Sequence, residues 1–440
     1  MKKLLPFKAL FYNQDKISSM ADVVTPPYDV ISPEMQSEFY ERSPYNFCRI
    51  DFTQEEGEAR YEVAQKVFAQ WLSEEILLSE KKPSLYLHHQ TFSLPDGRIV
   101  TRRGFYAARR IEDFSEGGIK PHEKTLDGPK ADRLKLTRAT ETNLSAVFSL
   151  YADEDLALQK KLEKVTLATP WMDFTTKEGE RHELWCVRDA ALCDEIDQFL
   201  SNRPLFIADG HHRYETALNY RNEIIEKYGE IDENSAARFL LMCFSNLHDP
   251  GMVILPIHRA LHNLANFSLA DFIDKLSNNF EVVKVTNQNQ REMLNNLSEL
   301  GRQHHAFLIL TKDPNESWLV SLSRERWLSS DLAKMIDPSL AALDVTVLHQ
   351  LVFQSILGLS EESQTRQENI IYWKSTEKAI AETRSGACDL TFILNATRIE
   401  DMQNVAMSGQ KMPQKSTYFY PKIMSGLVMH SVKPEQVDGI

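Results

Sequence analysis

Apolar and polar positions alternate along the chain in patterns that predict strands and helices, and the clearest pattern lies in its middle. Residues 205–208 are apolar and follow a proline, so they predict a buried strand. Asp209-Gly210 comes next and favours a tight turn, because glycine tolerates a positive φ. Residues 211–228 contain neither proline nor glycine, and apolar residues recur there near helical spacing. The pattern predicts a strand, a turn and a long helix.

The N-terminal part contains both patterns, the alternation typical of strands and the spacing of three to four residues typical of helices. Ser32-Pro33 is a helix-start signal, with serine as the N-cap and proline in the first turn. Pro95-Asp96-Gly97 separates two strand-like runs and predicts a hairpin. The elements expected here are strands at 23–24, 46–52, 85–92 and 99–109, and an amphipathic helix at 56–78.

The alternation of strands and helices continues to the C-terminus. Further strands are expected at 147–151, 185–187, 239–244 and 252–259, and further helices at 154–168, 190–200 and 338–358. We therefore expect a mixed α/β fold. The expected division is a main α/β domain over 1–264, a small α/β subdomain over 265–335, and a C-terminal segment over 336–440 that packs back on the main domain.

Composition and charge narrow the classes of protein. The net charge of −13, from 50 basic and 63 acidic residues, argues against general affinity for nucleic acid. The five cysteines are scattered without a CxxC pair, so free thiols in a reducing compartment are expected. The basic and apolar start is interrupted by Pro6 and Lys8, too early for a signal peptide, and no apolar run reaches transmembrane length. These features place the protein in the cytoplasm.

The central turn carries the strongest candidate chemistry. A strand-turn-helix corner points backbone N–H groups and a partial positive charge at one place. His211, His212 and Arg213 add two imidazoles and a guanidinium there, and arginine binds phosphate in a bidentate fashion. The natural ligand is an anion, with phosphate the first choice. The alternative is that Asp209 only caps the helix and the two histidines lie exposed on its first turn.

Two polar blocks precede this corner. The first lies between prolines that hold the chain extended, and its alternative is a proline-rich connector. The second is a polar loop, which is costly to order and therefore usually functional or mobile. His and Glu side chains there could serve acid/base chemistry or bind a metal. The candidate residues of these two blocks are Tyr28, Asp29, His122, Glu123, Asp132, Arg133 and Asn143.

Two further blocks follow the corner. The strand predicted at 252–259 ends in His258-Arg259, which could lie beside the central turn if the two strands are sheet neighbours. Near the C-terminus, Lys415, Ser416, Thr417 and Lys422 could bind a second anion or the same one. The alternatives are a capping histidine and a C-terminal strand that packs its aromatic residues into the core.

Four of these blocks resemble the DUF1015 proteins, a widespread prokaryotic family of unknown function. The resemblance runs from Phe7 to Val428. The segments that carry it are Pro26-Pro27-Tyr28-Asp29-Val30-Ile31-Ser32, Pro121-His122-Glu123 with Asp132-Arg133-Leu134, the stretch from Ile207 to Ala217, and Met412-Pro413 with the stretch from Lys415 to Lys422.

The turn Asp209-Gly210-His211-His212-Arg213 also resembles the nucleotide-binding box of the ParB/sulfiredoxin superfamily, in the form found in free-serine kinases. The resemblance implies a ParB/sulfiredoxin-like nucleotide-binding core with large insertions. It also implies that Gly210 lets the backbone approach a phosphate that the next three side chains bind. Sulfiredoxin has a reactive cysteine at the position of His211, so that activity is not implied. A proline-containing N-terminal segment would frame the site.

These resemblances imply an enzyme that moves a phosphoryl group between a nucleotide (ATP, ADP or CTP) and a small hydroxylated metabolite such as serine, as a kinase or a phosphatase. Asp29 or Glu123 would act as base or Mg²⁺ ligand. One alternative is a ParB-like nucleotide-binding regulator without turnover. Another is a metallohydrolase that uses His122, His211, His212 and His258, although no HExxH pair supports it. We expect the polar blocks to form one site.

Overall fold

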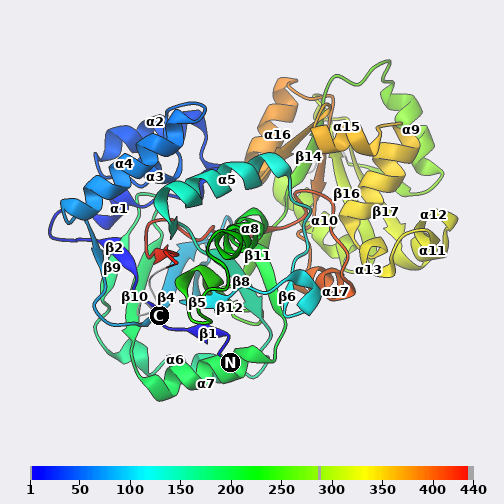
Figure 1. The fold of residues 1–440 in the computed structure, drawn as a ribbon. Coiled ribbons are helices and arrows are strands. Elements are labelled where there is room, and N and C mark those ends of the chain that lie inside the picture. Colours follow the sequence, from blue (N-terminus) through cyan, green and yellow to red (C-terminus); the bar gives the residue numbers. More distant parts are fainter. Residues whose placement is uncertain (1, 286–288, 435–440) are drawn as a thin grey trace. The chain divides into compact units, whose positions relative to one another are not determined.

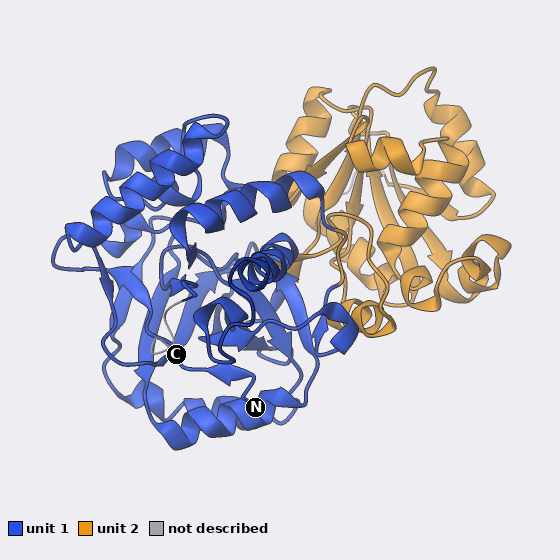
Figure 2. Cartoon of the chain, viewed as in Figure 1, with its two compact units in different colours: residues 1–121, 125–253, 421–440 blue, residues 122–124, 254–420 orange. Residues whose placement is uncertain are grey.

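The predicted strands assemble into two large sheets, each built by a different part of the chain (Figure 1). The computed structural model describes residues 2–285 and 289–434. The chain divides into unit 1, residues 1–121, 125–253 and 421–440, and unit 2, residues 122–124 and 254–420 (Figure 2). The expected mixed α/β class is confirmed. The boundaries of the two units differ from those of the expected segments 1–264, 265–335 and 336–440. That expected division stays a prediction about which parts of the chain fold on their own.

Unit 1 contains a nine-stranded mixed sheet. Antiparallel pairs predominate, and two pairs of strands run parallel, 147–151 with 239–246 and 119–120 with 205–209. The predicted hairpin is confirmed as the antiparallel pair of strands at 85–93 and 99–110. In sheet order the strands are β6 (Ile119–Lys120), β11 (Leu205–Asp209), β8 (Val147–Tyr151), β12 (Phe239–Asn246), β5 (Ile99–Arg110), β4 (Leu85–Ser93), β10 (Arg181–Val187) and β9 (Met172–Thr175), with β1 (Leu4–Leu5) paired to β5.

One face of this sheet packs against helices to form the main core. Alternate residues of the central strands, such as Leu87, Phe105 and Ile207, point to this face because side chains alternate along a strand. Tyr214 and Leu218, from the helix that follows β11, meet them there. The predicted strand-turn-helix is confirmed, and its core packing fixes where the helix begins.

The helices of unit 1 are short except for α4, α5, α7 and α8. Ser32 caps α2 by accepting the Met35 amide at 3.2 Å, so the predicted helix start is confirmed. The helices are α1 (Met20–Val23), η1 (Tyr28–Val30), α2 (Pro33–Arg42), α3 (Cys48–Asp51), α4 (Ala59–Ser73), η2 (Phe114–Glu116), α5 (Asp127–Thr140), α6 (Ala157–Leu162), η3 (Val165–Leu167), α7 (Ala190–Ser201), α8 (His211–Tyr228) and η4 (Ala236–Arg238).

Two strand predictions in the N-terminal part are wrong. Residues 23–24 lie at the end of helix α1, and most of 46–52 forms helix α3. Local hydrogen bonds favour a turn in both cases. Ser19 caps α1 by accepting the Ala21 amide at 3.2 Å. Asn46, the residue before the N-cap Phe47 of α3, accepts the Cys48 amide at 3.0 Å and so holds the turn that leads into this helix.

Unit 2 contains a six-stranded sheet that is antiparallel throughout. In order its strands are β15 (Glu281–Lys284), β17 (Ser317–Ser323), β16 (His304–Leu310), β19 (Leu390–Leu394), β14 (His258–Leu261) and β18 (Ile370–Trp373). Its helices are α9 (Leu269–Ser277), α10 (Gln290–Gly301), α11 (Arg324–Ser329), α12 (Asp331–Lys334), α13 (Pro338–Ala341), α14 (Asp344–Val347), the π-helix η5 (Leu348–Ile356), α15 (Glu361–Arg366), α16 (Thr376–Ser385) and α17 (Ile399–Ser408). The single helix predicted at 338–358 is thus a series of three.

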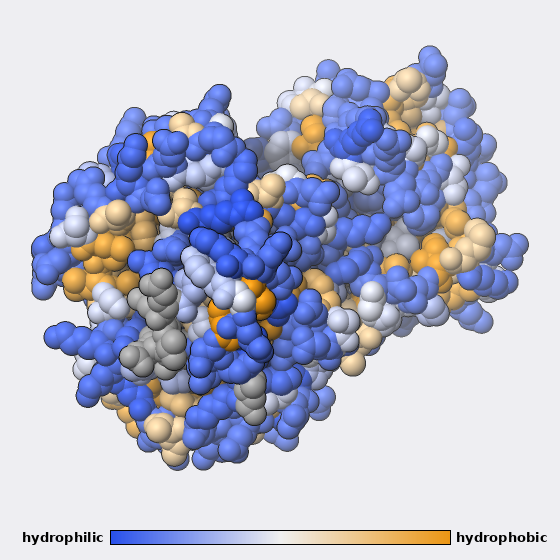
Figure 3. All heavy atoms as spheres, viewed as in Figure 1, coloured by the Kyte–Doolittle hydropathy of each residue, from blue (hydrophilic) through white to orange (hydrophobic). Residues whose placement is uncertain are grey.

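The remaining strands are short. β2 (Leu10–Tyr12) pairs with β3 (Leu77–Ser79), and β7 (Thr142–Asn143) pairs with β21 (His430–Ser431). β13 (Val253–Leu255) and β20 (Tyr418–Tyr420) lie where the chain passes from one unit to the other. In the described parts, no helix is long and apolar enough to cross a membrane. The face seen in Figure 3 is mostly hydrophilic, with scattered hydrophobic residues.

Candidate functional site

The corner between β11 and α8 is built around a left-handed glycine. Gly210 has φ +91° and is the N-cap residue of α8. A Cβ at this position would lie 2.9 Å from Nε of Arg213 and 3.0 Å from its Cζ. Glycine is therefore needed for its backbone conformation and for the space that it leaves. That space holds the Arg213 guanidinium, which packs against the glycine.

Asp209, the last residue of β11, binds two cations. Its Oδ2 accepts from Arg213 Nη2 at 2.5 Å, and its Oδ1 accepts from Lys422 Nζ. Arg213 Nη1 also donates to the Ala146 carbonyl. Helix α8 has no side-chain capping hydrogen bond, so Asp209 orients cations instead of capping the helix. Two cations thus share this carboxylate beside the start of α8, where the helix dipole is also positive.

The two histidines of the turn are held by protein contacts. His211 is buried, with 3% of its surface exposed, so it does not lie exposed on the first helical turn. His212 Nε2 accepts from the Leu126 amide at 2.9 Å, which requires a neutral ring with its proton on Nδ1. This contact holds the loop before α5 against α8.

Arg133, on α5, is buried and bound on two sides. Its Nη1 donates to Oδ1 of Asp51 at 2.8 Å and to the Asp51 carbonyl at 2.9 Å. Its Nε and Nη2 contact Oδ2 of Asp132 at 2.8 and 2.7 Å. The guanidinium also lies 3.9 Å from the ring centroid of Tyr28. The first and second predicted blocks therefore meet in unit 1.

The first predicted block adds the ring of Tyr28 and the carboxylate of Asp29 to the charge cluster around Arg133. Burial raises the pKa of Tyr28 to about 12, so the phenol stays neutral. Asp29 is exposed, and its charge acts on both Tyr28 and Asp51. Asp132 also accepts from Arg60 Nη1 at 3.0 Å, which fixes the carboxylate that holds Arg133.

Asp51 is the residue that the sequence interpretation missed. It is 3% exposed, and its Oδ2 has no hydrogen-bond partner within the described part of the chain. Burial raises the pKa of this carboxyl, and the charges of Arg133 and Arg213 partly offset the increase. A weak signal was present, because Asp51 stands directly between the apolar residues Ile50 and Phe52.

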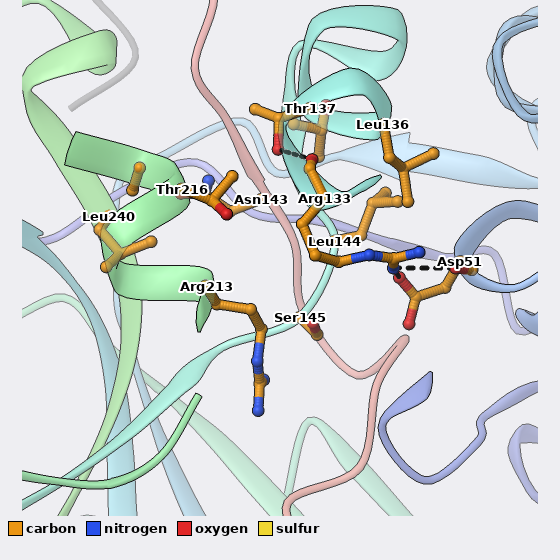
Figure 4. A pocket seen from close by; sticks show the side chains of 12 residues that line it. Asp51, Arg133, Leu136, Thr137, Asn143, Leu144, Ser145, Arg213, Thr216 and Leu240 are labelled. Atoms are coloured by element: carbon orange, nitrogen blue, oxygen red, sulfur yellow. Dashed lines mark hydrogen bonds and ion pairs between the residues drawn. The ribbon is translucent and has the colours of Figure 1, made fainter. Parts of the chain in front are cut away.

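Asp51, Arg133 and Arg213 line one pocket (Figure 4). Arg133 extends from α5 to bind Asp51, and Arg213 extends from the first turn of α8. The volume is about 40 Å³, and one water requires about 10–15 Å³, so the pocket holds a few waters or one small polar group. The other lining residues are Leu136, Thr137, Thr142, Asn143, Leu144, Ser145, Thr216, Ala217 and Leu240.

On the face of the sheet opposite the main core, a row of polar side chains forms hydrogen bonds that end at the backbone of Lys422. Arg102 of β5 is buried and donates to Oε1 of Gln90 at 2.5 Å. Gln90, its cross-strand neighbour on β4, donates from Nε2 to Glu180 at 2.7 Å and to the Lys422 carbonyl at 3.4 Å. The sequence interpretation missed this row because its members look like ordinary polar strand positions.

Other predicted residues lie in unit 2. His122 is fully buried, and its Nε2 lies 3.1 Å from Oγ1 of Thr417. Glu123 forms a parallel bridge with Met412. Ser416 donates from Oγ to the Pro413 carbonyl at 2.6 Å. The second and fourth blocks therefore meet in unit 2 as two extended segments.

The strand predicted to end in His258-Arg259 is wrong, because these residues begin β14, and β14 is not a sheet neighbour of β11. β14 pairs with β18 and β19 in the sheet of unit 2, whereas β11 pairs with β6 and β8 in unit 1. His258 accepts the Leu394 amide on Nδ1 at 3.2 Å and contacts Thr376 through Nε2 at 2.9 Å, and burial lowers its pKa to about 4. It is a neutral core histidine.

The predicted residues are thus divided between the units. Unit 1 holds Tyr28, Asp29, Asp132, Arg133, Asn143, Asp209, Gly210, His211, His212, Arg213 and Lys422. Unit 2 holds His122, Glu123, His258, Arg259, Lys415, Ser416 and Thr417. Asn143 accepts the Leu241 amide at 3.1 Å, and Lys415 is exposed. Among the described residues, no three His, Cys, Asp or Glu side chains converge to hold a metal ion. The single site stays a prediction.

Similarities to individual known proteins are distant. A phosphoglucomutase from Staphylococcus haemolyticus is 26% identical over 177 residues, which span 37% of this chain and 32% of that protein. A conserved hypothetical protein from Pyrococcus furiosus aligns over 76% of this chain and 97% of its own, with 14% identity and a TM-score of 0.35. A free serine kinase in complex with AMP aligns over 76% of this chain and 93% of its own, with 14% identity and a TM-score of 0.35.

The family match is extensive. The family described as "Protein of unknown function (DUF1015)" matches residues 4–346. This range includes the first two predicted polar blocks, which contain Tyr28 and Arg133, and the whole β11–α8 corner. The chain therefore belongs to the DUF1015 family.

Proposed function

We propose that unit 1 binds the phosphate of a nucleotide or another phosphorylated small molecule and transfers a phosphoryl group to or from a small hydroxylated metabolite. One observation carries the proposal. Two arginines, Arg133 and Arg213, line the same pocket as Asp51, a buried carboxylate with one oxygen that has no partner among the described residues. Guanidinium groups suit phosphate oxygens, and a carboxylate with a raised pKa suits proton transfer.

The electrostatics at the start of α8 favour an anion. Arg213 and Lys422 share the single carboxylate of Asp209, so one positive charge is not balanced within this trio. The first amides of a helix have no acceptor inside it, and they carry a partial positive charge. A phosphate placed there would receive backbone and guanidinium hydrogen bonds together, as at other helix N-termini.

Asp51 is the proposed base. In the kinase direction, the acceptor hydroxyl oxygen forms a bond to phosphorus while the bond from phosphorus to the nucleotide oxygen breaks. The hydroxyl proton passes to Oδ2 of Asp51, and the phosphate charge is stabilised by Arg133 and Arg213. In the phosphatase direction, water takes the place of the acceptor hydroxyl. Asp29, exposed at the edge of the same charge cluster, is the other candidate base.

The acidic side chains near the pocket fit a Mg²⁺ ion whose ligands come mainly from the nucleotide. Mg²⁺ usually takes one or two protein carboxylates, with waters and substrate phosphates as its other ligands. With Asp51 as the base, the exposed Asp29 would supply one such carboxylate. The described residues offer no cluster of three metal-ligating side chains. Mg²⁺ there would neutralise phosphate charge.

The nucleotide and the acceptor come from the sequence resemblance. The turn Asp209-Gly210-His211-His212-Arg213 resembles the phosphate-binding box of the free-serine kinases within the ParB/sulfiredoxin superfamily. We therefore propose ATP, ADP or CTP as the nucleotide and serine or a similar hydroxylated metabolite as the acceptor. Binding without turnover, as in a ParB-like regulator, is the second proposal that the same box supports.

The test compares two arginines of the same helix. Arg133→Gln removes a pocket guanidinium, whereas Arg138→Gln removes an exposed arginine that pairs with Glu223. Nucleotide affinity is measured by calorimetry with Mg²⁺, and ADP formation from ATP is measured with serine present. We expect affinity to fall about 10- to 100-fold for Arg133→Gln, the value of one charge-assisted hydrogen bond, and to stay unchanged for Arg138→Gln.

Each result has a defined meaning. Circular dichroism confirms that both variants fold, and Arg213→Gln provides an independent variant of the same pocket. Nucleotide binding without ADP formation supports the regulator. Equal affinity in the wild type and in both pocket variants refutes the proposed site.

A further inference from the structure

Arg259, on β14 of unit 2, is a buried cation without an anionic partner. It is 1% exposed. Its Nη1 donates to the Ile257 carbonyl, and its Nη2 donates to the Lys415 carbonyl at 3.0 Å. Its Nε has no hydrogen-bond partner, and no ion pair joins it to a carboxylate, within the described residues. Carbonyl dipoles therefore provide all of its hydrogen-bond acceptors.

A charge in this position is costly. Moving a guanidinium out of water removes its hydration, and two neutral carbonyls replace only part of it. Burial accordingly lowers the pKa of Arg259 to about 10. The other buried arginines of the described chain bind a side chain: Arg133 binds Asp51, Arg109 binds Glu112 at 3.0 Å, and Arg102 binds the amide oxygen of Gln90. Arg259 binds only backbone carbonyls, and this difference points to an anion that is supplied from outside.

A second buried nitrogen belongs to the same part of unit 2, because the ring of His349 packs on Phe353, and Phe353 packs on Phe392, the cross-strand neighbour of Arg259. His349, on the π-helix η5, is 7% exposed, and its Nε2 also has no hydrogen-bond partner among the described residues. Burial first, and the charge of Arg259 second, lower the pKa of His349 to about 3. π-helical turns are rare and often occur at functional sites. Here the π-helix brings a ring nitrogen into the electrostatic field of an uncompensated arginine.

Tyr372 and the backbone of Lys415 lie next to the Arg259 guanidinium. Its guanidinium lies 5.4 Å from the ring centroid of Tyr372, which is partly exposed. On another side lies the backbone of Lys415, a non-glycine residue in the left-handed region with φ +57°. That conformation costs about 1–2 kcal/mol for an ordinary residue. The Lys415 carbonyl therefore occupies an acceptor position that a stronger, charged acceptor could take.

We propose that Arg259 and His349 form a binding site for the carboxylate of a small molecule in unit 2. One carboxylate oxygen accepts from Nε of Arg259 and the other from a neighbouring Nη, in the bidentate geometry that guanidinium groups favour. Nε2 of His349 donates to the same carboxylate. Tyr372 covers the guanidinium face.

The charge of the site selects the class of ligand. Arg259 contributes one positive charge, and the buried His349 contributes none. A carboxylate brings one negative charge and restores neutrality. A phosphate dianion would leave an excess negative charge in a buried place, which is again costly. This inference concerns residues of unit 2 and does not depend on the phosphoryl transfer proposed for unit 1.

The test uses a matched pair of ligands on the full-length protein. Glycerate carries a carboxylate, and glycerol has the same carbon skeleton without it. Calorimetry should show binding of glycerate and none of glycerol. Arg259→Gln should weaken glycerate binding at least tenfold, whereas Arg291→Gln, at an exposed arginine of α10, should leave it unchanged.

A second variant protects the test against misfolding. His349→Phe removes the ring nitrogen and leaves Arg259 in place, and it should also weaken glycerate binding. Absence of glycerate binding to the wild type overturns the proposal, as does full affinity in Arg259→Gln. Inorganic phosphate binding more tightly than glycerate in an Arg259-dependent manner overturns the carboxylate assignment. Arg213→Gln should retain glycerate affinity, so failure at the unit 1 site is distinguishable.

Discussion

Substituting Gly210 by alanine tests how the β11–α8 corner is built. Gly210 has φ +91°, and a Cβ there would lie 2.9 Å from Nε of Arg213. Two costs therefore add. The left-handed backbone costs an alanine about 1–2 kcal/mol. The guanidinium must also move away and weaken its bond to Asp209, and a charge-assisted hydrogen bond contributes about 1.5–3 kcal/mol.

Gly179 provides the matched control. It has φ +88°, and nothing lies within 4 Å of a Cβ built on it. Gly179→Ala should therefore show only the backbone cost of about 1–2 kcal/mol. Gly210→Ala should lower the free energy of unfolding by about 1.5–3 kcal/mol more, as the displaced Arg213 loses its contacts.

The assay is urea denaturation of both variants, followed by fluorescence, with the free energy of unfolding from linear extrapolation. Nucleotide affinity is measured alongside, and it should fall in Gly210→Ala alone because Arg213 has moved. Equal destabilisation by the two substitutions would show that Arg213 does not occupy the space beside Gly210. The steric account of this corner would then be wrong.

Three further predictions concern charge. Asp51→Asn should lower the phosphoryl-transfer rate about 10²- to 10⁴-fold, and it should remove the acid limb of the pH–rate profile. In the wild type, that limb should lie above the usual aspartate range because burial raises the pKa of this carboxyl. Lys422→Met should leave Asp209 with Arg213 alone and lower nucleotide affinity about tenfold, by the value of one lost charge contact, as calorimetry at fixed salt can show. Burial lowers the pKa of His258 and of His430 to about 4. Because the unfolded chain binds these protons more tightly, the free energy of unfolding should fall as pH drops from about 6.5 to 4, by up to about 3 kcal/mol for each histidine. Urea denaturation at pH 7 and pH 4.5 measures this loss, and a stability independent of pH in that range would contradict it.

Local sequence determined the elements whose signals lie within a few residues. The strand before Asp209, the helix from His211 and the start of α2 at Pro33 were all predicted, because turn residues and caps act on their immediate neighbours. The hairpin of β4 and β5 was predicted for the same reason. Strand predictions at 23–24 and 46–52 failed, since short apolar runs do not distinguish a strand from one turn of helix.

Tertiary structure decided which chemistry comes together. Asp51 and Arg133 are far apart in the chain, and only the packing of α3 near α5 makes them an ion pair at 2.8 Å. His258-Arg259 looked like part of the central site, but strand pairing placed it in the other sheet. Burial is likewise decided by the fold, because only packing removes water from a polar residue, and the sequence gives its type but not its exposure. The sequence by itself determined the residue types and the local corner. The fold determined which of them face one another, and so which pKa values are shifted and which buried arginines have no carboxylate partner among the described residues.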